Sequence, residues 1–144
     1  MSAGSKDCLF CKLINRELPI SVVYEDEKVI SFMDIQPINP GHLLIIPKTH
    51  ATYLKDLKPD IGGQLFKTAM KLSEALRNSG IRCDGVNLFL ADGEVAGQEV
   101  FHVHLHVIPR FEGDGFGFKF DDSYWVLPER SELDDVAEKI AFTS

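Results

Sequence analysis

Three of the chain's five histidines lie on one short apolar segment, at His102, His104 and His106. Side chains two residues apart on a β-strand point to the same face, so this spacing predicts three imidazoles on one face and aliphatic residues on the other. The alternative to a functional site is a partly exposed strand whose polar face consists of histidines by chance. Three histidines in register, with no serine, threonine or lysine between them, favour a functional face instead. Near neutral pH, imidazole can act as a nucleophile, a hydrogen-bond donor or a cation.

A single metal ion does not explain all three histidines. Strand residues two apart are separated by about 6.6 Å and residues four apart by about 13 Å, whereas zinc–ligand bonds are about 2.0–2.3 Å long. Neighbouring imidazoles could instead contact different atoms of one phosphate group. The turn before the segment contains Gly93 and Gly97, where the backbone can approach a ligand closely. A glycine-rich turn alone is commonly only a turn, but beside the histidines it predicts a phosphate-binding site.

A second group of possible ligands begins with Cys8 and Cys11, whose Cys-x-x-Cys spacing is typical of structural zinc sites. Two more ligands are needed, and His50 with one histidine of the triple run can supply them. The cysteines could also be two small apolar residues or a redox pair. No βαβ pattern surrounds them, which weakens the redox interpretation. We interpret Cys83, which has no partner nearby, as a structural thiol.

Hydrophobic periodicity predicts the elements that must position these residues. Strands are expected at 21–26, 28–35, 42–47, 86–92 and 101–109, the first two as a hairpin. Helices are expected at 8–16, 60–79 and 131–141. In the long helix, one apolar face is formed by Ile61, Leu65, Ala69, Leu72 and Leu76. Strands with helices packed to one side predict an α+β fold.

Composition limits the functional classes. The 144 residues, 44% hydrophobic and 26% charged, indicate one ordinary globular domain. A net charge of −7 argues against binding to nucleic acid backbones. No apolar run has the length of a membrane span and the N-terminus lacks a signal-peptide pattern, so we expect a cytoplasmic protein with no membrane partner. Three cysteines in such a chain favour reduced thiols or a metal over disulfides.

The run from His102 to Ile108 resembles the histidine triad motif of the HIT superfamily of nucleotide hydrolases and transferases. Three blocks resemble the family in family order: CLFCKLINRELP, VYEDEKVISFMDIQPINPGHLLIIPKTH and AGQEVFHVHLHVIPRF. The chain is most similar to zinc-containing microbial members, because it has the cysteine pair, the sequence IPRF after the triad and the sequence GDGFGF that follows. The resemblance implies a single HIT domain over 1–144, with the triad motif at 102–108 and a C-terminal tail at 111–144. It also implies a mainly antiparallel sheet of about five strands, with one long helix and short helices.

The resemblance implies a role for each matched residue. His104 would attack the α-phosphorus of a nucleotide and form a nucleotidyl-histidine intermediate. His106 would contact the α-phosphate and the leaving atom, His42 would be a fourth active-site histidine, and His102 would orient the nucleophile's surroundings. The implied ligands of a structural zinc are Cys8, Cys11, His50 and His102.

The resemblance also implies a purine nucleotide site. Asp34 matches the residue that binds the ribose hydroxyls. The apolar walls of the purine pocket match Leu9, Phe10, Leu13, Leu18, Phe32 and Ile35, and the phosphate-holding segment matches Gly97, Gln98 and Val100. Two positions depart from the family pattern: Ala91 replaces a frequent asparagine or glutamine, and Glu99 replaces a frequent serine or threonine.

The implied function is hydrolysis at the α-phosphate of a purine nucleotide, with a nucleoside phosphoramidate as the first expectation. Alternatives are a diadenosine polyphosphate hydrolase, a nucleotidyl transferase and a nucleotide-binding regulatory protein. We also expect a homodimer with the sheet continued across its twofold axis. The resemblance implies it. The apolar stripe of the 60–79 helix also favours it, and so does the apolar strand at 86–92, because a strand at a sheet edge exposes unpaired backbone groups. The alternative is a monomer in which the stripe covers its own sheet, and periodicity does not separate the two.

Overall fold

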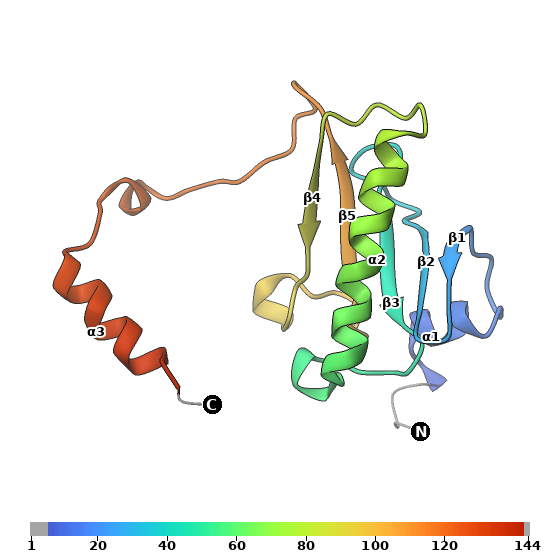
Figure 1. The fold of residues 1–144 in the computed structure, drawn as a ribbon, viewed down its shortest axis with the longest axis horizontal. Coiled ribbons are helices and arrows are strands. Elements are labelled where there is room, and N and C mark those ends of the chain that lie inside the picture. The colour runs from blue at the N-terminus through green and yellow to red at the C-terminus, as the bar shows by residue number, and fades with distance from the viewer. Residues whose placement is uncertain (1–5, 143–144) are drawn as a thin grey trace. The chain divides into compact units, whose positions relative to one another are not determined.

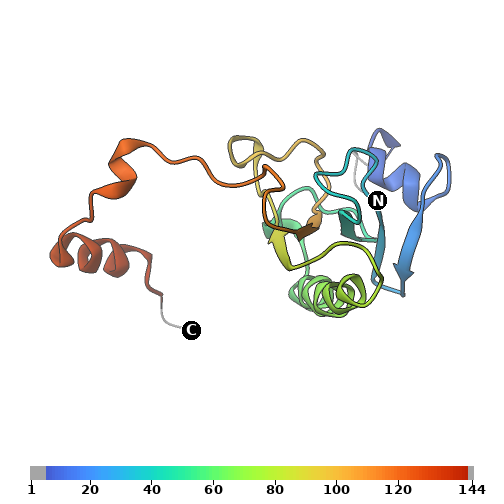
Figure 2. The same ribbon diagram turned by 90° about the horizontal axis from the view of Figure 1, so that it is seen from above.

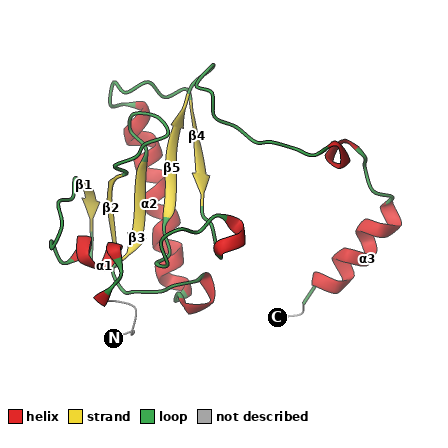
Figure 3. Cartoon of the chain, turned by 180° about the vertical axis from the view of Figure 1, so that it is seen from behind, coloured by secondary structure: helices red, strands yellow, loops and turns green. Residues whose placement is uncertain are grey.

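The computed structural model describes residues 6–142, which fall into two compact units divided between Asp114 and Gly115. The first unit contains every residue implicated in chemistry by the sequence. Its strands, shown in Figures 1 and 3, are β1 (Val22–Glu25), β2 (Val29–Met33), β3 (Leu43–Pro47), β4 (Gly85–Phe89) and β5 (Leu105–Arg110). Its α-helices are α1 (Leu9–Ile14) and α2 (Pro59–Arg77).

The five strands form one antiparallel sheet in the order β1-β2-β3-β5-β4. The β1–β2 hairpin is closed by Asp26, whose carboxylate accepts hydrogen bonds from the N–H groups of Lys28 and Val29 at 2.7 and 2.8 Å. The expected antiparallel α+β architecture of about five strands with one long helix is therefore confirmed. Strand β4 forms one edge of the sheet.

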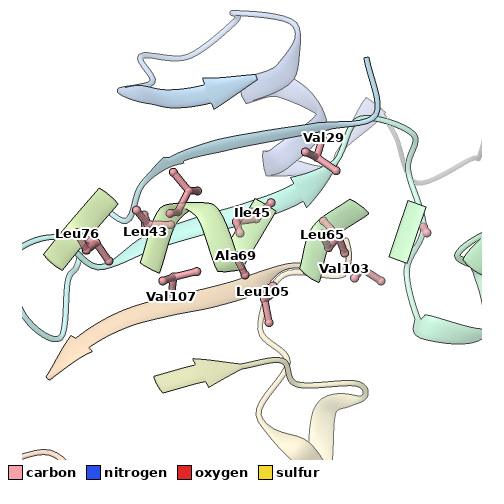
Figure 4. Close-up of a cluster of buried hydrophobic side chains, with 11 residues drawn as sticks. Val29, Leu43, Ile45, Leu65, Ala69, Leu76, Val103, Leu105 and Val107 are labelled. Carbon is pink, nitrogen blue, oxygen red and sulfur yellow. The ribbon is translucent and has the colours of Figure 1, made fainter. Parts of the chain in front are cut away.

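Helix α2 lies along one face of the sheet (Figure 2). Pro59 occupies its first turn, where a missing N–H costs nothing, and Gly80 follows its end with a φ of 86°. The predicted stripe of Leu65, Ala69 and their helical neighbours is buried against β3 and β5 (Figure 4), although Ile61 is only half-buried. This face of the helix thus covers the chain's own sheet.

The opposite face of the sheet is covered by α1, which buries Phe10 and Cys11 against Ile30 and Leu44. This helix ends at Ile14, earlier than the sequence predicted. Asn15 caps it, and Arg16 adopts a left-handed φ of 62°, which ends the helical path before Pro19 is reached. The two faces therefore hold separate apolar clusters.

The strand containing the histidines is shorter than expected. We predicted a strand over 101–109, but β5 begins at Leu105. The carbonyls of Pro47 and His102 accept hydrogen bonds from imidazoles at 2.8 Å, so they are not used in a strand ladder. Side chains still alternate in this extended segment, because Val103 and Leu105 pack in the α2 cluster.

The second unit, residues 115–142 of the described chain, contains η4 (Asp122–Trp125) and α3 (Arg130–Ile140), which confirms the predicted C-terminal helix. Its aromatic side chains contact one another, with Phe120 stacked on Tyr124 at a centroid separation of 3.8 Å. The helices within 6–142 include none with the length and apolarity needed to cross a membrane.

Candidate functional site

The alternation of side chains before and along β5 places His102, His104 and His106 away from the α2 core. His102 and His104 are buried, and His106 is half-buried. Phe10 of α1 packs edge-on against the rings of both His102 and His104, with centroids 5.8 and 5.0 Å apart. The predicted imidazole face is therefore present, and it is bounded by the helix that carries the cysteines.

Hydrogen bonding assigns the tautomer of His104. Its Nδ1 lies 2.8 Å from the carbonyl oxygen of His102, and a carbonyl can only accept, so Nδ1 carries the proton. A neutral imidazole has only one N–H, and Nε2 of His104 therefore carries a lone pair. This is the arrangement that a nucleophilic histidine requires.

A chain of hydrogen bonds links His106 to His42. The N–H of Ile38 donates to Nδ1 of His42 at 3.0 Å, so the proton of His42 is on Nε2. That Nε2 lies 2.9 Å from Nδ1 of His106 and 3.5 Å from Oδ2 of Asp34. Because Nδ1 of His106 accepts, its own proton is on Nε2. His106 is thus prepared to donate a hydrogen bond through Nε2.

The pKa values of these imidazoles are lowered, chiefly by burial, which disfavours the charged form. Burial and, to a smaller extent, the neighbouring His104 and His42 lower the pKa of His106 to about 4. Burial also lowers the pKa of His42 and His104, which Asp34 partly offsets. These three side chains are therefore neutral at pH 7, so His104 keeps its lone pair.

A second cluster brings together Cys8, Cys11, His50 and His102, whose ligand atoms all lie within 4.8 Å of one another. Nδ1 of His102 is 3.4 Å from Sγ of Cys8, and Nδ1 of His50 is 3.3 Å from Sγ of Cys11. The sequence left open which histidine of the triad would complete the set, and only the resemblance pointed to His102. The geometry brings that histidine to the cysteines.

The donor set of this cluster fits zinc. A tetrahedral zinc ion with sulfur and nitrogen ligands requires S···N separations of about 3.6 Å. The observed S···N separations are 3.3, 3.4 and 3.6 Å. Nε2 of His102 donates to the carbonyl of Pro47 at 2.8 Å, which leaves Nδ1 free to bind a metal. Burial raises the pKa of Cys11 to about 12, so a cation is needed to hold it as a thiolate.

Both ring nitrogens of His102 are engaged by this cluster and by Pro47. The predicted influence of His102 on the nucleophile therefore acts through its backbone carbonyl, which holds Nδ1 of His104. The two clusters are joined at this one residue.

The predicted phosphate-holding segment follows the short helix η3 (Glu94–Ala96). Gly97 has a φ of 100°, which favours glycine, and a Cβ there would meet open space. The buried Gln98 side chain accepts from the N–H of Gly93 and donates to the carbonyl of Thr52, both at 2.8 Å. Gln98 therefore fixes the loop by its side chain. Within 6–142, the N–H groups of Glu99 and Val100 have no hydrogen-bond partner in the protein.

The predicted purine-pocket residues differ in exposure. Phe10 and Phe32 are buried and pack edge-on at 5.7 Å, and Phe10 also packs against His104. Leu9 and Leu18 are partly exposed, and Leu13 packs at the margin of the α1 cluster. Ile35, in contrast, is 98% exposed and touches little of the protein. Asp34 accepts a hydrogen bond from the N–H of Gln36 at 2.8 Å, which holds its carboxylate near His42.

Several contributors to the site were missed by sequence reasoning. The carbonyl of Pro47 and the N–H of Ile38 set the tautomers of His102 and His42, and backbone groups leave no trace in a residue pattern. Phe89 packs edge-on against His106 at 5.7 Å, and only its place in an apolar strand could have drawn attention to it. Of the two departures from the family pattern, Ala91 is buried and Glu99 is exposed.

Comparison with known proteins identifies relatives along most of the chain. A HIT domain family model matches residues 15–113. An uncharacterized HIT-like protein of Methanocaldococcus jannaschii is 45% identical over 133 residues, which cover 92% of this chain and 98% of the relative. A crystal structure of a HIT family protein from Bacillus anthracis matches with a TM-score of 0.83 and 39% identity, covering 93% of this chain and 94% of that one.

Other relatives have more informative names. An adenosine 5′-monophosphoramidase of Candida albicans is 38% identical over 119 residues, 80% of this chain and 78% of the relative. A zinc-bound histidine triad family protein from Mycobacterium smegmatis superposes with a TM-score of 0.76 and 36% identity, covering 92% of this chain and 99% of that one. The span matched by the family model, residues 15–113, includes the histidines of both clusters. On this sequence and structural similarity, the chain belongs to the HIT family.

Proposed function

We propose that this protein is a nucleotide hydrolase that cleaves purine nucleoside phosphoramidates at the α-phosphate through a nucleotidyl-histidine intermediate. The observation that carries the proposal is the hydrogen bond from Nδ1 of His104 to the carbonyl of His102, which leaves Nε2 free to attack phosphorus. The named activity of the Candida albicans relative supports the choice of substrate.

In the proposed reaction, Nε2 of His104 forms a bond to phosphorus as the bond from phosphorus to the leaving nitrogen breaks. The leaving amine keeps the electron pair and takes up one proton. The His42–His106 pair beside Asp34 can supply that proton, because a bound phosphate anion raises the pKa of nearby imidazoles. Water then attacks phosphorus as the bond from phosphorus to Nε2 breaks, which returns the electron pair to His104 and releases the nucleoside monophosphate. The proton that water loses restores the His42–His106 pair.

Backbone donors complete the proposed site. The unpartnered N–H groups of Glu99 and Val100 would bind the equatorial phosphate oxygens, and Gly97 allows the close approach. Asp34 would bind the ribose hydroxyls through the oxygen that faces away from Gln36, and Phe10 with Phe32 would contact the purine.

The substrate assignment is tested by a side-by-side turnover assay with an adenosine phosphoramidate and a diadenosine polyphosphate. We expect kcat/KM to be at least about tenfold higher for the phosphoramidate, because the site must hold only one nucleotide. A guanosine phosphoramidate measures base preference in the same assay. A higher kcat/KM for the polyphosphate would replace the proposed activity with that of a dinucleoside polyphosphate hydrolase.

We further propose a structural zinc ion bound by Cys8, Cys11, His50 and His102. The zinc-bound relative from Mycobacterium smegmatis and the tetrahedral separations of the donors support it. The ion would connect the start of α1 to the segments after β3 and before β5. Its contribution would be to hold His102, and thereby the carbonyl that orients His104.

A homodimer is also proposed. The buried stripe of α2 packs on the sheet of its own chain, so it does not support a dimer. The features that still support one are the unpaired edge of β4 and the outer side of α2. Phe66 and Met70 on that side are 56% and 61% exposed. A twofold pairing that buries them and continues the sheet at β4 would remove an exposed edge strand.

Light scattering at micromolar concentration decides the oligomeric state. We expect twice the chain mass of 16.1 kDa for the wild type. Phe66→Glu with Met70→Glu should shift the mass toward one chain, because two carboxylates would be buried without partners at the interface. Val23→Glu, on the opposite edge strand β1, is the matched control and should remain a dimer. A wild-type mass of one chain would refute the dimer.

A further inference from the structure

One pocket in the described chain is acidic, and it lies between the start of α1, the segment after β3 and the phosphate-holding segment. Its walls include the apolar residues Leu9, Val100 and Phe101 and the acidic residues Asp7 and Glu99. Cys8 and His50 of the proposed zinc site and the neighbouring Thr52 complete them. No lysine or arginine lines it. A pocket at a site for phosphate esters would be expected to carry cations, so its charge requires an explanation.

The pocket adjoins the reaction centre through both segments that form it. Leu9 precedes Phe10, whose ring packs against His104 with centroids 5.0 Å apart. Glu99 and Val100 precede the triad and contribute the unpartnered N–H groups of the phosphate segment. A group attached to a phosphate held by these N–H groups would therefore lie next to the pocket.

An in-line displacement puts the leaving atom on the side of phosphorus opposite the nucleophile. His104 is buried, whereas Glu99 and Asp7 of the pocket are exposed. In this proposal the leaving group points away from His104 and toward these exposed residues. A zinc ion with two thiolates and two neutral imidazoles would have no net charge, so it would not neutralise them.

We propose that Glu99 is a specificity-determining residue that selects leaving groups carrying a positive charge. This inference rests on the proposed phosphoramidate hydrolysis and narrows its substrate class to nucleoside phosphoramidates of amines that bear a second, cationic group. The methylene chain of such an amine would contact Leu9, Val100 and Phe101, and its ammonium group would lie by Glu99 and Asp7. An anionic leaving group, such as a second nucleotide, would be repelled.

The test uses three adenosine phosphoramidates of similar length, made from n-pentylamine, cadaverine and δ-aminovalerate. They place a methyl, an ammonium and a carboxylate group at the far end of the leaving group. For the wild type, we expect kcat/KM to fall about fivefold from ammonium to methyl and again from methyl to carboxylate. The preference should shrink in high salt, because exposed charges are screened.

Variants of Glu99 test the residue itself. Glu99→Gln should reduce the ammonium-to-methyl ratio to about one, and Glu99→Lys should favour the carboxylate. Glu94→Gln is the matched control, because Glu94 is an exposed acid of the same loop that does not line the pocket. It should keep the wild-type ratios. Unchanged melting temperatures in all variants would show that folding is preserved.

The outcomes distinguish a failure of the proposed hydrolysis from a failure of the proposed role of Glu99. If the wild type hydrolyses none of the three compounds, the proposed phosphoramidate hydrolysis fails, and this inference with it. If it hydrolyses all three equally, or if Glu99→Gln keeps the ammonium preference, the hydrolysis stands and the role of Glu99 is overturned. Ratios that follow the charge at position 99 support the inference.

Discussion

Replacement of His104 by alanine is expected to lower turnover of an adenosine phosphoramidate by at least about 10³-fold, because the covalent route loses its nucleophile. Binding of adenosine monophosphate should survive, since the apolar pocket and the backbone donors remain. Steady-state kinetics and calorimetric titration measure the two effects separately. Near-wild-type turnover by His104→Ala would exclude the covalent mechanism.

One conservative variant separates the function of Nε2 from the structural bond of Nδ1. The side-chain amide of His104→Asn can occupy the Nδ1 position and donate to the carbonyl of His102, so this variant should fold normally and remain inactive. Acid quenching of the wild type during turnover of a substrate labelled at phosphorus should leave label on the protein. The label should be absent from His104→Asn. Label retained by this variant would place the nucleophile elsewhere.

Removal of the proposed zinc is expected to have the largest effect on stability. Cys8→Ser and Cys11→Ser should abolish binding of one zinc per chain and lower the melting temperature by about 10 °C, because the binding free energy of a structural metal contributes directly to folding. Elemental analysis and calorimetry measure the two quantities. Cobalt substitution offers a further readout, since thiolate ligands give absorption bands that the serine variants should lack.

Cys83→Ser is the matched control for both zinc variants. Cys83 is the third thiol of the chain, and its Sγ contacts only the carbonyl of Gly85 at 3.3 Å among the hydrogen-bonding groups of residues 6–142. This variant should keep its zinc and its melting temperature. Purified wild-type protein with no zinc, or serine variants with full metal content, would contradict the proposed site.

The proposed zinc site and the proposed nucleophile His104 are linked through His102, which connects the two expected effects. Its Nδ1 faces the cysteines and its carbonyl holds His104. Loss of the metal should therefore lower activity as well as stability, although the ion makes no contact with the reacting phosphorus in this scheme. A structural ion can in this way determine the precision of a neighbouring site.

Much of the fold could be predicted from local sequence. The apolar runs of β2 and β3, the acidic turn at Asp26 and the helical stripe of α2 all predicted elements that the structure contains. Such patterns are reliable because they record which residues of each element are buried. The ends of elements were less predictable. Helix α1 stopped at Ile14 and β5 started at Leu105 because individual backbone groups found other partners.

The sequence by itself determined which residue types are available for chemistry: three imidazoles in register, two thiols at metal-binding spacing and two further histidines near β3. Tertiary structure alone decided how they are grouped. His102 turns to Cys8 and Cys11, whereas His106 turns to His42, because α1 packs at one end of the imidazole row and the loop before β3 at the other. It also decided the protonated nitrogen of each ring, since that depends on carbonyl and N–H groups brought from distant strands, which no residue spacing records.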